Sequence, residues 1–459
     1  MFVDIKTDVE LADVAKLFYG DIMPNISLAR NGRNFAVDID GKRYDVSLVD
    51  SIYDIIPEAH MSGRLSKIAL YDALNSHTGQ EMPWGALTGV RPTKLFYEAM
   101  RAGKTEEQAT EIMQRVYRVG SSRATILKRI VGEQKGKVEF PTEYVNMYVH
   151  IPYCTTRCSY CSFVSAPIDK NRAQSKEYVS LLCDEITRSK ELLWSSGKKI
   201  LSVYIGGGTP TALDARELDA LLSAIGKFDC EYTCEAGRPD TVSEEKLEVL
   251  KAHGVTRVCV NPQTLNQKTL DAIGRKHTVK QFFDVYDMVK ARGFDINCDL
   301  IAGLEGETLS DFIFSFDGVR ALKPHNITVH SLSRKNGSAI RYNEIENIET
   351  SKMTDYALAN LDKYNPYYLY RQKRQACNLE NVGFSLPNKQ CINNITTMEE
   401  TVGVMACGAG AISKFVHNGN ISRFANMRDV PLYISRYEEK LQAKLDYWSA
   451  ALQSENNCL

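Results

Sequence analysis

Three cysteines in the sequence have the spacing of ligands for an iron–sulfur cluster. Cys154, Cys158 and Cys161 form a C-x3-C-x2-C pattern directly after an apolar run at 147–151. Three thiolates can bind three irons of a [4Fe–4S] cubane and leave the fourth iron without a protein ligand. A small molecule could bind that iron through an amine and a carboxylate, and an electron from the cluster could then cleave a carbon–sulfur bond of its sulfonium. The spacing therefore predicts a cluster that starts radical chemistry.

Two simpler interpretations of the cysteines stay open on spacing alone. A structural zinc ion usually takes four closed ligands, commonly from C-x2-C pairs. Ser159 and Ser162 are poor candidates for the fourth ligand. The three cysteines could also be unrelated core thiols, because cysteine is readily buried.

A glycine-rich segment, Gly206-Gly207-Gly208-Thr209-Pro210, follows the apolar run at 200–205. Glycines permit a close approach of the backbone, so its amides and carbonyls could bind the two ends of an amino-acid-like ligand. The alternative is an ordinary tight turn between a strand and a helix.

Polar residues near the ends of later apolar runs extend the candidate site. Glu235 ends the third run, Gln263 follows the fourth, and Asp299 lies near the end of the fifth. Ligands in βα architectures bind at the carboxyl ends of the strands, so we expect these side chains on one face with the cysteines and glycines. Arg275 is a further candidate. Each of the four could instead be a solvated surface residue.

Six apolar runs, separated by helical segments, would position these residues. One helical segment at 214–228 has apolar residues at i, i+3, i+4 and i+7, and another starts after Ser243 and stops at Gly254. This alternation predicts a parallel sheet covered by helices, with fewer units than the eight of a closed barrel. The runs are 147–151, 200–205, 232–236, 257–260, 296–301 and 327–331.

The sequence on either side of this core does not show the regular alternation of apolar runs and helical segments. The N-terminal part has the pattern of a β-hairpin around Asp40-Gly41, and Pro92 suits the first turn of one of its helices. In the C-terminal part the alternation of strands and helices ends, and the sequence is rich in tyrosine and asparagine. We expect an α+β module at 1–140, a core at 141–340 and an α+β extension that covers the site at 341–459. The N-terminal helices are expected at about 9–20, 64–76, 92–102 and 105–133.

Composition and charge argue against several classes of function. Charged residues make up 25% of the 459 residues and the formal net charge is -1, so nothing favours nucleic acid as a partner. The N-terminus has early acidic residues and no apolar centre, unlike a signal peptide, and no run of about 18 apolar residues predicts a membrane span. We expect a cytoplasmic protein whose twelve cysteines are mostly buried thiols rather than disulfides.

Together, these motifs resemble those of the radical S-adenosylmethionine family of oxygen-independent coproporphyrinogen III oxidases and their relatives. The resemblance covers about 145–335 and continues through 378–383 and 408–413. The segment Thr88-Gly-Val-Arg-Pro-Thr-Lys94 is similar to the HemZ-type branch, which has an extra N-terminal module. The motifs are Y-x-H-I-P-x-C-x3-C-x-Y-C, GGGTPT, N-P-Q-T-L and D-L-I-x-G-L.

The resemblance implies an α/β fold with a partial (β/α)6 TIM-like barrel, a [4Fe–4S] cluster and one or two molecules of S-adenosyl-L-methionine. It implies that Tyr148, Gly207 and Glu235 contact the cofactor bound to iron. The implied partners are a tetrapyrrole substrate and a low-potential electron donor such as flavodoxin or ferredoxin. Positions that would line the site of a second cofactor molecule are Tyr160, Gly208, Thr209, Gln263, Arg275 and Asp299.

The reaction of the family removes a hydrogen atom from each of two propionates of coproporphyrinogen III. Loss of carbon dioxide then gives protoporphyrinogen IX. Phe163 stands where the best-studied oxidases carry a further cysteine, which makes the sequence closer to branches that include haem-delivery relatives. The alternatives are a haem-binding or haem-transfer protein, with His325, His330 or Cys377 as candidate ligands, and a radical enzyme acting on another tetrapyrrole.

The C-terminal segment is the expected lid, because a carbon radical must be sheltered from solvent. A group of aromatic and basic residues there could flank a flat anionic ring, or could be an amphipathic element with a solvated basic face. The group is Tyr364, Tyr367, Tyr368, Tyr370, Arg371, Lys373 and Arg374. The cysteines at 377, 391, 407 and 458 are too irregularly spaced to favour a second cluster.

Overall fold

The computed structural model describes residues 2–20, 22–89, 91–161, 165–333, 344–372 and 378–456, without the side chains of 344–348 and 456. The chain forms two compact units. The first comprises Met1–Glu133 and Leu369–Asn381, and the second comprises Gln134–Tyr368 and Val382–Leu459. Within the described ranges, no helix is both long and apolar enough to cross a membrane.

The first unit contains an antiparallel sheet in which the four strands follow chain order. Asp40 and Gly41 both have positive φ, 47° and 83°, as a two-residue hairpin turn requires. The predicted hairpin is therefore confirmed. The strands are β1 (Phe2–Asp4), β2 (Ile26–Asn31), β3 (Asn34–Ile39) and β4 (Lys42–Ser47).

Helices make up most of the rest of the first unit. Pro92 starts α3, as expected. The segment expected to be helical at 105–133 forms two helices, because Arg118 adopts a left-handed conformation with φ 61° between them. The Arg118 guanidinium is held there by Asp72, at 2.7 and 2.8 Å. The helices are α1 (Val9–Tyr19), α2 (Glu58–Thr78), α3 (Pro92–Arg101), α4 (Glu106–Arg115) and α5 (Ser121–Gln134).

The second unit is built on a large sheet, and each of the six predicted apolar runs forms one of its strands. The order among the described residues is β13-β14-β12-β11-β10-β9-β8-β5-β15-β16-β17. The strands from β5 to β12 in this order are all parallel. These six are β5 (Tyr144–Ile151), β8 (Lys199–Gly207), β9 (Glu231–Glu235), β10 (Arg257–Cys259), β11 (Asp295–Ala302) and β12 (Asn326–Ser331).

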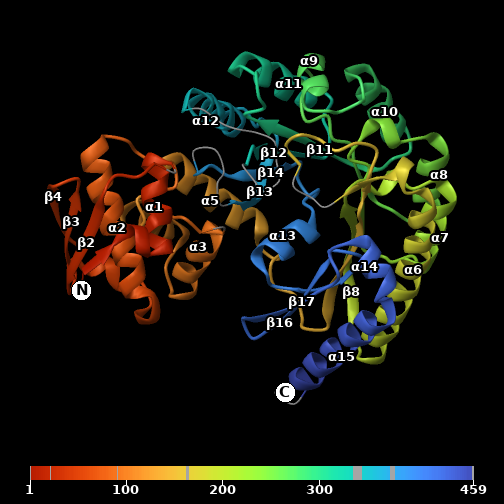
Figure 1. Cartoon of the computed structure of the whole chain (residues 1–459), viewed down its shortest axis with the longest axis horizontal. Coiled ribbons are helices and arrows are strands. Elements are labelled where there is room, and N and C mark those ends of the chain that lie inside the picture. Colours follow the sequence, from red (N-terminus) through yellow and green to blue (C-terminus); the bar gives the residue numbers. More distant parts are fainter. Residues whose placement is uncertain are drawn as a thin grey trace. The chain divides into compact units, whose positions relative to one another are not determined.

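Helices follow the parallel strands and form an arc along the outer side of the sheet (Figure 1). The predicted N-cap at Ser243 is confirmed, since its side chain accepts from the Lys246 amide. Asp214 caps α7 in the same way and forms a capping box with Glu217. The helices are α6 (Arg172–Ser195), α7 (Ala215–Ile225), α8 (Glu244–Ala252), α9 (Gln267–Ala272), α10 (Val279–Ala291) and α11 (Leu309–Ala321).

The C-terminal part extends the sheet at both edges. At one edge β15 pairs parallel with β5, and at the other β14 pairs antiparallel with β12. The later elements are α12 (Glu344–Ala359), β13 (Asn365–Tyr370), β14 (Asn381–Ser385), α13 (Ile392–Glu399), β15 (Gly403–Cys407), β16 (Ile412–His417), β17 (Asn420–Ala425), α14 (Val430–Ser435) and α15 (Tyr437–Asn456). The predicted α/β fold with a partial barrel is confirmed, and the described strands do not close into a full barrel.

Candidate active site

The cysteine segment begins where β5 ends. Cys154 lies in a two-residue strand, β6 (Tyr153–Cys154), which pairs with β7 (Ala166–Pro167). Its Sγ lies 3.4 Å from Oγ1 of Thr209, directly after the glycine segment. The Cys161 amide donates to the carbonyl of Cys158 at 3.1 Å, which folds the second half of the motif into a tight turn. The three cysteines therefore belong to one short loop.

Polar contacts hold this loop against segments that follow later strands. Thr155 donates to Oδ2 of Asp240 at 3.0 Å, and Asp240 lies in a short 3-10 helix, η5 (Pro239–Thr241), shortly after β9. Thr156 donates to the carbonyl of Gly274, which follows α9, at 3.0 Å. The loop is thus fixed across the carboxyl-terminal edge of the sheet.

Arg238 links the loop to the end of β9. Its Nη1 donates to the Thr156 carbonyl at 3.2 Å and lies 3.6 Å from Sγ of Cys158, while its Nε donates to Asp240 at 3.2 Å. The buried Arg238 guanidinium therefore places a positive charge beside Cys158 and joins the cysteine loop to Asp240. Arg238 could not be identified from the sequence, because an isolated arginine in a loop has no distinctive spacing.

The glycine segment packs against the beginning of the cysteine loop. Gly207 has φ 107°, and a Cβ there would overlap the His150 ring; a Cβ on Gly208 would overlap the Tyr153 carbonyl. The amide of Gly208 donates to Ile151 at 2.8 Å, and that of Thr209 donates to Tyr153 at 2.7 Å. These two amides therefore serve intrachain contacts, contrary to our expectation that such amides are available to a ligand.

Glu235 is buried beside two tyrosines. The Tyr204 hydroxyl donates to Oε1 of Glu235 at 2.6 Å, and the Tyr148 ring stacks on Tyr204 with centroids 6.3 Å apart. Burial raises the pKa of Glu235 to about 7; the Tyr204 hydrogen bond opposes this shift and the charge of Asp299 adds to it. Burial and the nearby Glu235 also raise the pKa of Tyr148. Glu235 can therefore hold or release a proton near neutral pH.

Asp299 is surrounded by side chains from β11, from β12 and from the segment after β10. Asn261 donates to Oδ2 at 2.8 Å and Asn297 to Oδ1 at 2.7 Å, and Nε2 of His330 lies 3.6 Å from Oδ2. These contacts hold the carboxylate in one orientation.

Gln263 adopts a left-handed conformation, with φ 68°, next to Asp299. Its amide donates to the Asp299 carbonyl at 3.0 Å, and its carbonyl accepts from Ile301 at 3.0 Å. The side-chain Oε1 is buried without a hydrogen-bond partner among the described atoms. Because buried polar atoms are normally paired, this oxygen is the feature of the site that best fits a bound polar ligand.

Arg275 is a buried cross-link rather than the solvated base considered above. It donates to the Tyr160 hydroxyl at 3.0 Å, to the carbonyl of Asn261 at 2.9 Å and to the carbonyl of Gly237. Tyr160 lies within the cysteine loop, and burial raises the pKa of its hydroxyl, with Arg275 opposing the shift. Arg275 thus ties the cysteine loop to the segments after β9 and β10.

Contacts join several of the candidate residues in or after the parallel strands: Cys154 with Thr209, Tyr160 with Arg275, and Gln263 with Asp299. In the described part of the chain, no three His, Cys, Asp or Glu side chains are grouped closely enough to hold a single metal ion. In a cubane each thiolate binds a different iron atom. The donor set, with three thiols on one loop beside Arg238 and the unpartnered Gln263 oxygen, fits a multi-iron cluster with a polar ligand.

Several other candidates have structural partners of their own. Nδ1 of His325 accepts from the Ile296 amide at 3.0 Å. Cys391 donates to Glu231 at 3.0 Å, and Cys407 lies 3.2 Å from Nζ of Lys444. Phe163, Lys373, Arg374, Cys377 and Cys458 lie outside the described residues.

Arg371 differs from the expectation that its side chain faces a ligand or solvent. It is buried, and its guanidinium donates to the carbonyls of Leu87, Gly89 and Asn378. Tyr364, Tyr367 and Tyr368 are buried as well. The lid was predicted from composition, which does not distinguish an arginine that binds carbonyls from one that faces a ligand.

Comparisons with known proteins give the family of the chain. The sequence profile of the Radical SAM superfamily matches residues 148–317. The chain is 38% identical over 395 residues to the oxygen-independent coproporphyrinogen-III oxidase-like protein HemZ of Bacillus subtilis, covering 82% of this chain and 78% of that protein. It is also 32% identical to the heme chaperone HemW of Lactococcus lactis over 277 residues, covering 58% of this chain and 68% of the relative.

A solved structure shares the fold. Coproporphyrinogen III oxidase (HemN) from Escherichia coli superposes with a TM-score of 0.53 at 20% sequence identity, covering 67% of this chain and 72% of that chain.

Proposed function

The chain belongs to the radical SAM superfamily, within the family of HemZ-type oxygen-independent coproporphyrinogen-III oxidase-like proteins, and from this premise we propose that it performs radical chemistry on a tetrapyrrole. The proposed reaction is the oxidative decarboxylation of coproporphyrinogen III to protoporphyrinogen IX. For each of two propionates, one hydrogen atom passes from the side chain to the carbon radical that the cofactor would supply, carbon dioxide is lost, and the remaining electron passes to an external one-electron oxidant. A vinyl group is the product at each position.

We propose that Cys154, Cys158 and Cys161 hold a [4Fe–4S] cluster. When bound, the cluster would supply the electron that cleaves S-adenosyl-L-methionine to a carbon radical. The observation that carries this proposal is the loop itself, in which all three cysteines are held at the carboxyl-terminal edge of the sheet by Arg238 and by contacts to Asp240 and Gly274.

Glu235 is the proposed partner of the cofactor's ammonium group, together with Tyr148 and Gly207. Its raised pKa supports this role. A cation that enters a buried site favours the ionised form of a nearby carboxyl, so Glu235 would release its proton as the cofactor binds.

A second cofactor molecule, if bound, would use the remaining candidate residues. The buried, unpartnered Oε1 of Gln263 supports a polar ligand at this position, and the donors around Asp299 would keep its carboxylate oriented. These residues are Tyr160, Gly208, Thr209, Gln263, Arg275 and Asp299.

Anaerobic reconstitution followed by product analysis tests the proposal. Near four irons per chain are expected, and incubation with coproporphyrinogen III, S-adenosyl-L-methionine and a low-potential reductant should release carbon dioxide and a divinyl product. Cys158→Ala should lose iron and activity. Cys230→Ala, which removes a half-buried thiol elsewhere in the same unit, should retain both. A protein with an intact cluster that forms only 5′-deoxyadenosine and no divinyl product would contradict the decarboxylation.

Haem transfer is the second candidate, and the similarity to HemW relatives favours it. It predicts that one haem binds per chain with a shift in the haem absorption spectrum, and that no tetrapyrrole is consumed. Absence of that shift on titration with haem would exclude it. The two candidates thus give opposite results in the same pair of assays.

A further inference from the structure

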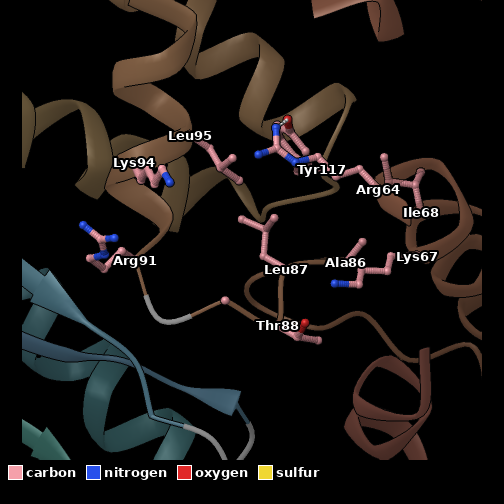
Figure 2. A pocket seen from close by; sticks show the side chains of 11 residues that line it. Arg64, Lys67, Ile68, Ala86, Leu87, Thr88, Arg91, Lys94, Leu95 and Tyr117 are labelled. Atoms are coloured by element: carbon pink, nitrogen blue, oxygen red, sulfur yellow. Dashed lines mark hydrogen bonds between the residues drawn. The ribbon is translucent and has the colours of Figure 1, made fainter. Parts of the chain in front are cut away.

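The first unit contains a cavity of about 340 Å³ between α2, the segment 86–89 and the start of α3 (Figure 2). Four basic residues line it: Arg64, Lys67, Arg91 and Lys94. Apolar side chains, including Leu87 and Leu95, form another part of the wall. Among the described residues that line the cavity, none is acidic. A cavity of this size matches sites for small organic ligands.

The positive charges of the cavity are only partly neutralised. Arg64 donates to Glu98 at 3.2 Å through both terminal nitrogens. Lys67 pairs at 2.6 Å with Glu10, whose side chain is 73% exposed. An ion pair that is so open to water contributes little to stability. Lys94 is exposed and makes no hydrogen bond or ion pair within the described ranges. The cavity therefore has cationic groups available to a ligand.

One wall of the cavity is held by buried polar contacts. The Leu87 carbonyl accepts from Arg371 at 2.9 Å and from Asn378 at 3.3 Å, and the Gly89 carbonyl accepts from Arg371 at 3.3 Å. The Arg371 guanidinium lies 5.3 Å from the Trp84 ring centroid. This wall is formed before any ligand binds, so little ordering of the chain opposes binding.

We propose that this cavity binds a small organic anion with an apolar body and a carboxylate or phosphate group. The apolar body would contact Leu87 and Leu95. The anionic group would contact one of the two lysines that line the cavity, Lys67 or Lys94, and Arg91 adds positive charge to the lining. Arginine and lysine together with an apolar wall select such molecules over both inorganic ions and neutral lipids. The site lies within the first unit and does not depend on the proposed cluster.

Fluorescence titration with 8-anilinonaphthalene-1-sulfonate tests this site in the full-length protein, since that probe joins apolar rings to an anionic group. The Kd should rise at least about fivefold in the Lys67→Gln/Lys94→Gln double variant, because a loss of about 1 kcal/mol corresponds to this factor. Lys104→Gln removes an exposed lysine of the same unit outside the cavity and should leave the Kd unchanged. Cys158→Ala should also leave it unchanged, which separates this site from the proposed tetrapyrrole site.

Competition in the wild-type protein identifies the anionic group. Octanoate carries a carboxylate and octyl phosphate carries a phosphate. Displacement of the probe by either compound supports the proposal and shows which anionic group the cavity binds. Octanol, which has the same apolar chain without charge, should not displace the probe. The proposal is overturned if the double variant binds the probe as the wild type does, or if octanol competes as well as both anions.

Discussion

The hydroxyl of Tyr204 and the carboxyl of Glu235 form a 2.6 Å hydrogen bond at the point where β9 ends. The carboxyl is buried, and burial raises its pKa to about 7 in spite of this hydrogen bond. An unfolded glutamate has a pKa of about 4.3. Glu235 is therefore the group in the candidate site whose protonation changes most on folding at near-neutral pH.

Glu235→Gln should remove a pH dependence of stability. The folded wild type retains the proton on Glu235 up to a higher pH than the unfolded chain does. The contribution of Glu235 to the free energy of unfolding is therefore complete below about pH 4.3 and is lost as the pH rises to about 7. The change amounts to about 4 kcal/mol over this window. Denaturant unfolding of cluster-free protein at pH 5, 6, 7 and 8 measures it. A wild-type-to-variant difference that stays constant with pH would contradict the raised pKa.

Arg238→Gln should weaken iron retention without unfolding the protein. The variant loses the charge beside Cys158 and the contact to the Thr156 carbonyl, and losing such a supporting group typically lowers metal affinity about 10–100-fold. The rate of iron release to a chelator measures the effect. Arg436→Gln, which removes an exposed arginine paired with Glu439, is the matched control. Equal release rates in the two variants would show that Arg238 has no role at the loop.

Lys444→Met should destabilise the second unit by about 3–5 kcal/mol, because it leaves a buried carboxylate without its cation. Lys444 and Glu185 are 0% and 2% exposed and lie 2.7 Å apart. Tyr433 and Asn426 also donate to Glu185, so its position is fixed and it cannot turn to solvent. Thermal unfolding compares this variant with Lys440→Met, a half-buried lysine of the same helix that pairs with the exposed Glu439, and little change is expected for that variant. Similar unfolding midpoints would refute the importance of the buried pair.

Gly207→Ala should be more harmful than Gly226→Ala, although both glycines have positive φ, 107° and 88°. A Cβ at position 226 meets only the end of the flexible Lys190 side chain, whereas one at 207 overlaps the His150 ring. The conformational penalty of about 1 kcal/mol applies to both, and the overlap adds about 1–3 kcal/mol at position 207. The yield of soluble protein and the unfolding midpoint measure the difference. If both variants behave alike, the close packing of β8 on β5 is not essential.

The strands of the core could be predicted because each buried parallel strand is a short, nearly continuous apolar run. The run at 200–205, for example, lies inside β8, and the one at 232–236 overlaps β9. The edge strand β15 could not be predicted in this way. It pairs with β5 across more than 250 residues of sequence, from Val145 to Gly403, and no local pattern encodes such a distant partner.

The candidate site was predictable where its residues follow strands at a regular position, as Glu235 and Gln263 do. Arg238 and Tyr204 were missed because their importance depends on what they contact, Cys158 and Glu235, and not on spacing. The environment of Arg371 was predicted wrongly for the same reason. A buried arginine binds groups inside the protein, whereas an arginine at the surface faces solvent or a ligand. The sequence alone does not reveal which arginine is buried.

Residues 369–381 belong to the first unit although they follow most of the second unit in sequence. This restricts where the coding sequence can be cut to separate the two units. Glu380 accepts from Trp84 at 2.6 Å and pairs with Arg123 at 3.1 Å. A single cut at the 133/134 junction would therefore leave a truncated protein in which Glu380 has lost Trp84 and Arg123, and Arg371 has lost the carbonyls of Leu87 and Gly89. Recombination or engineering that exchanges the N-terminal unit must replace two separate stretches of coding sequence at once.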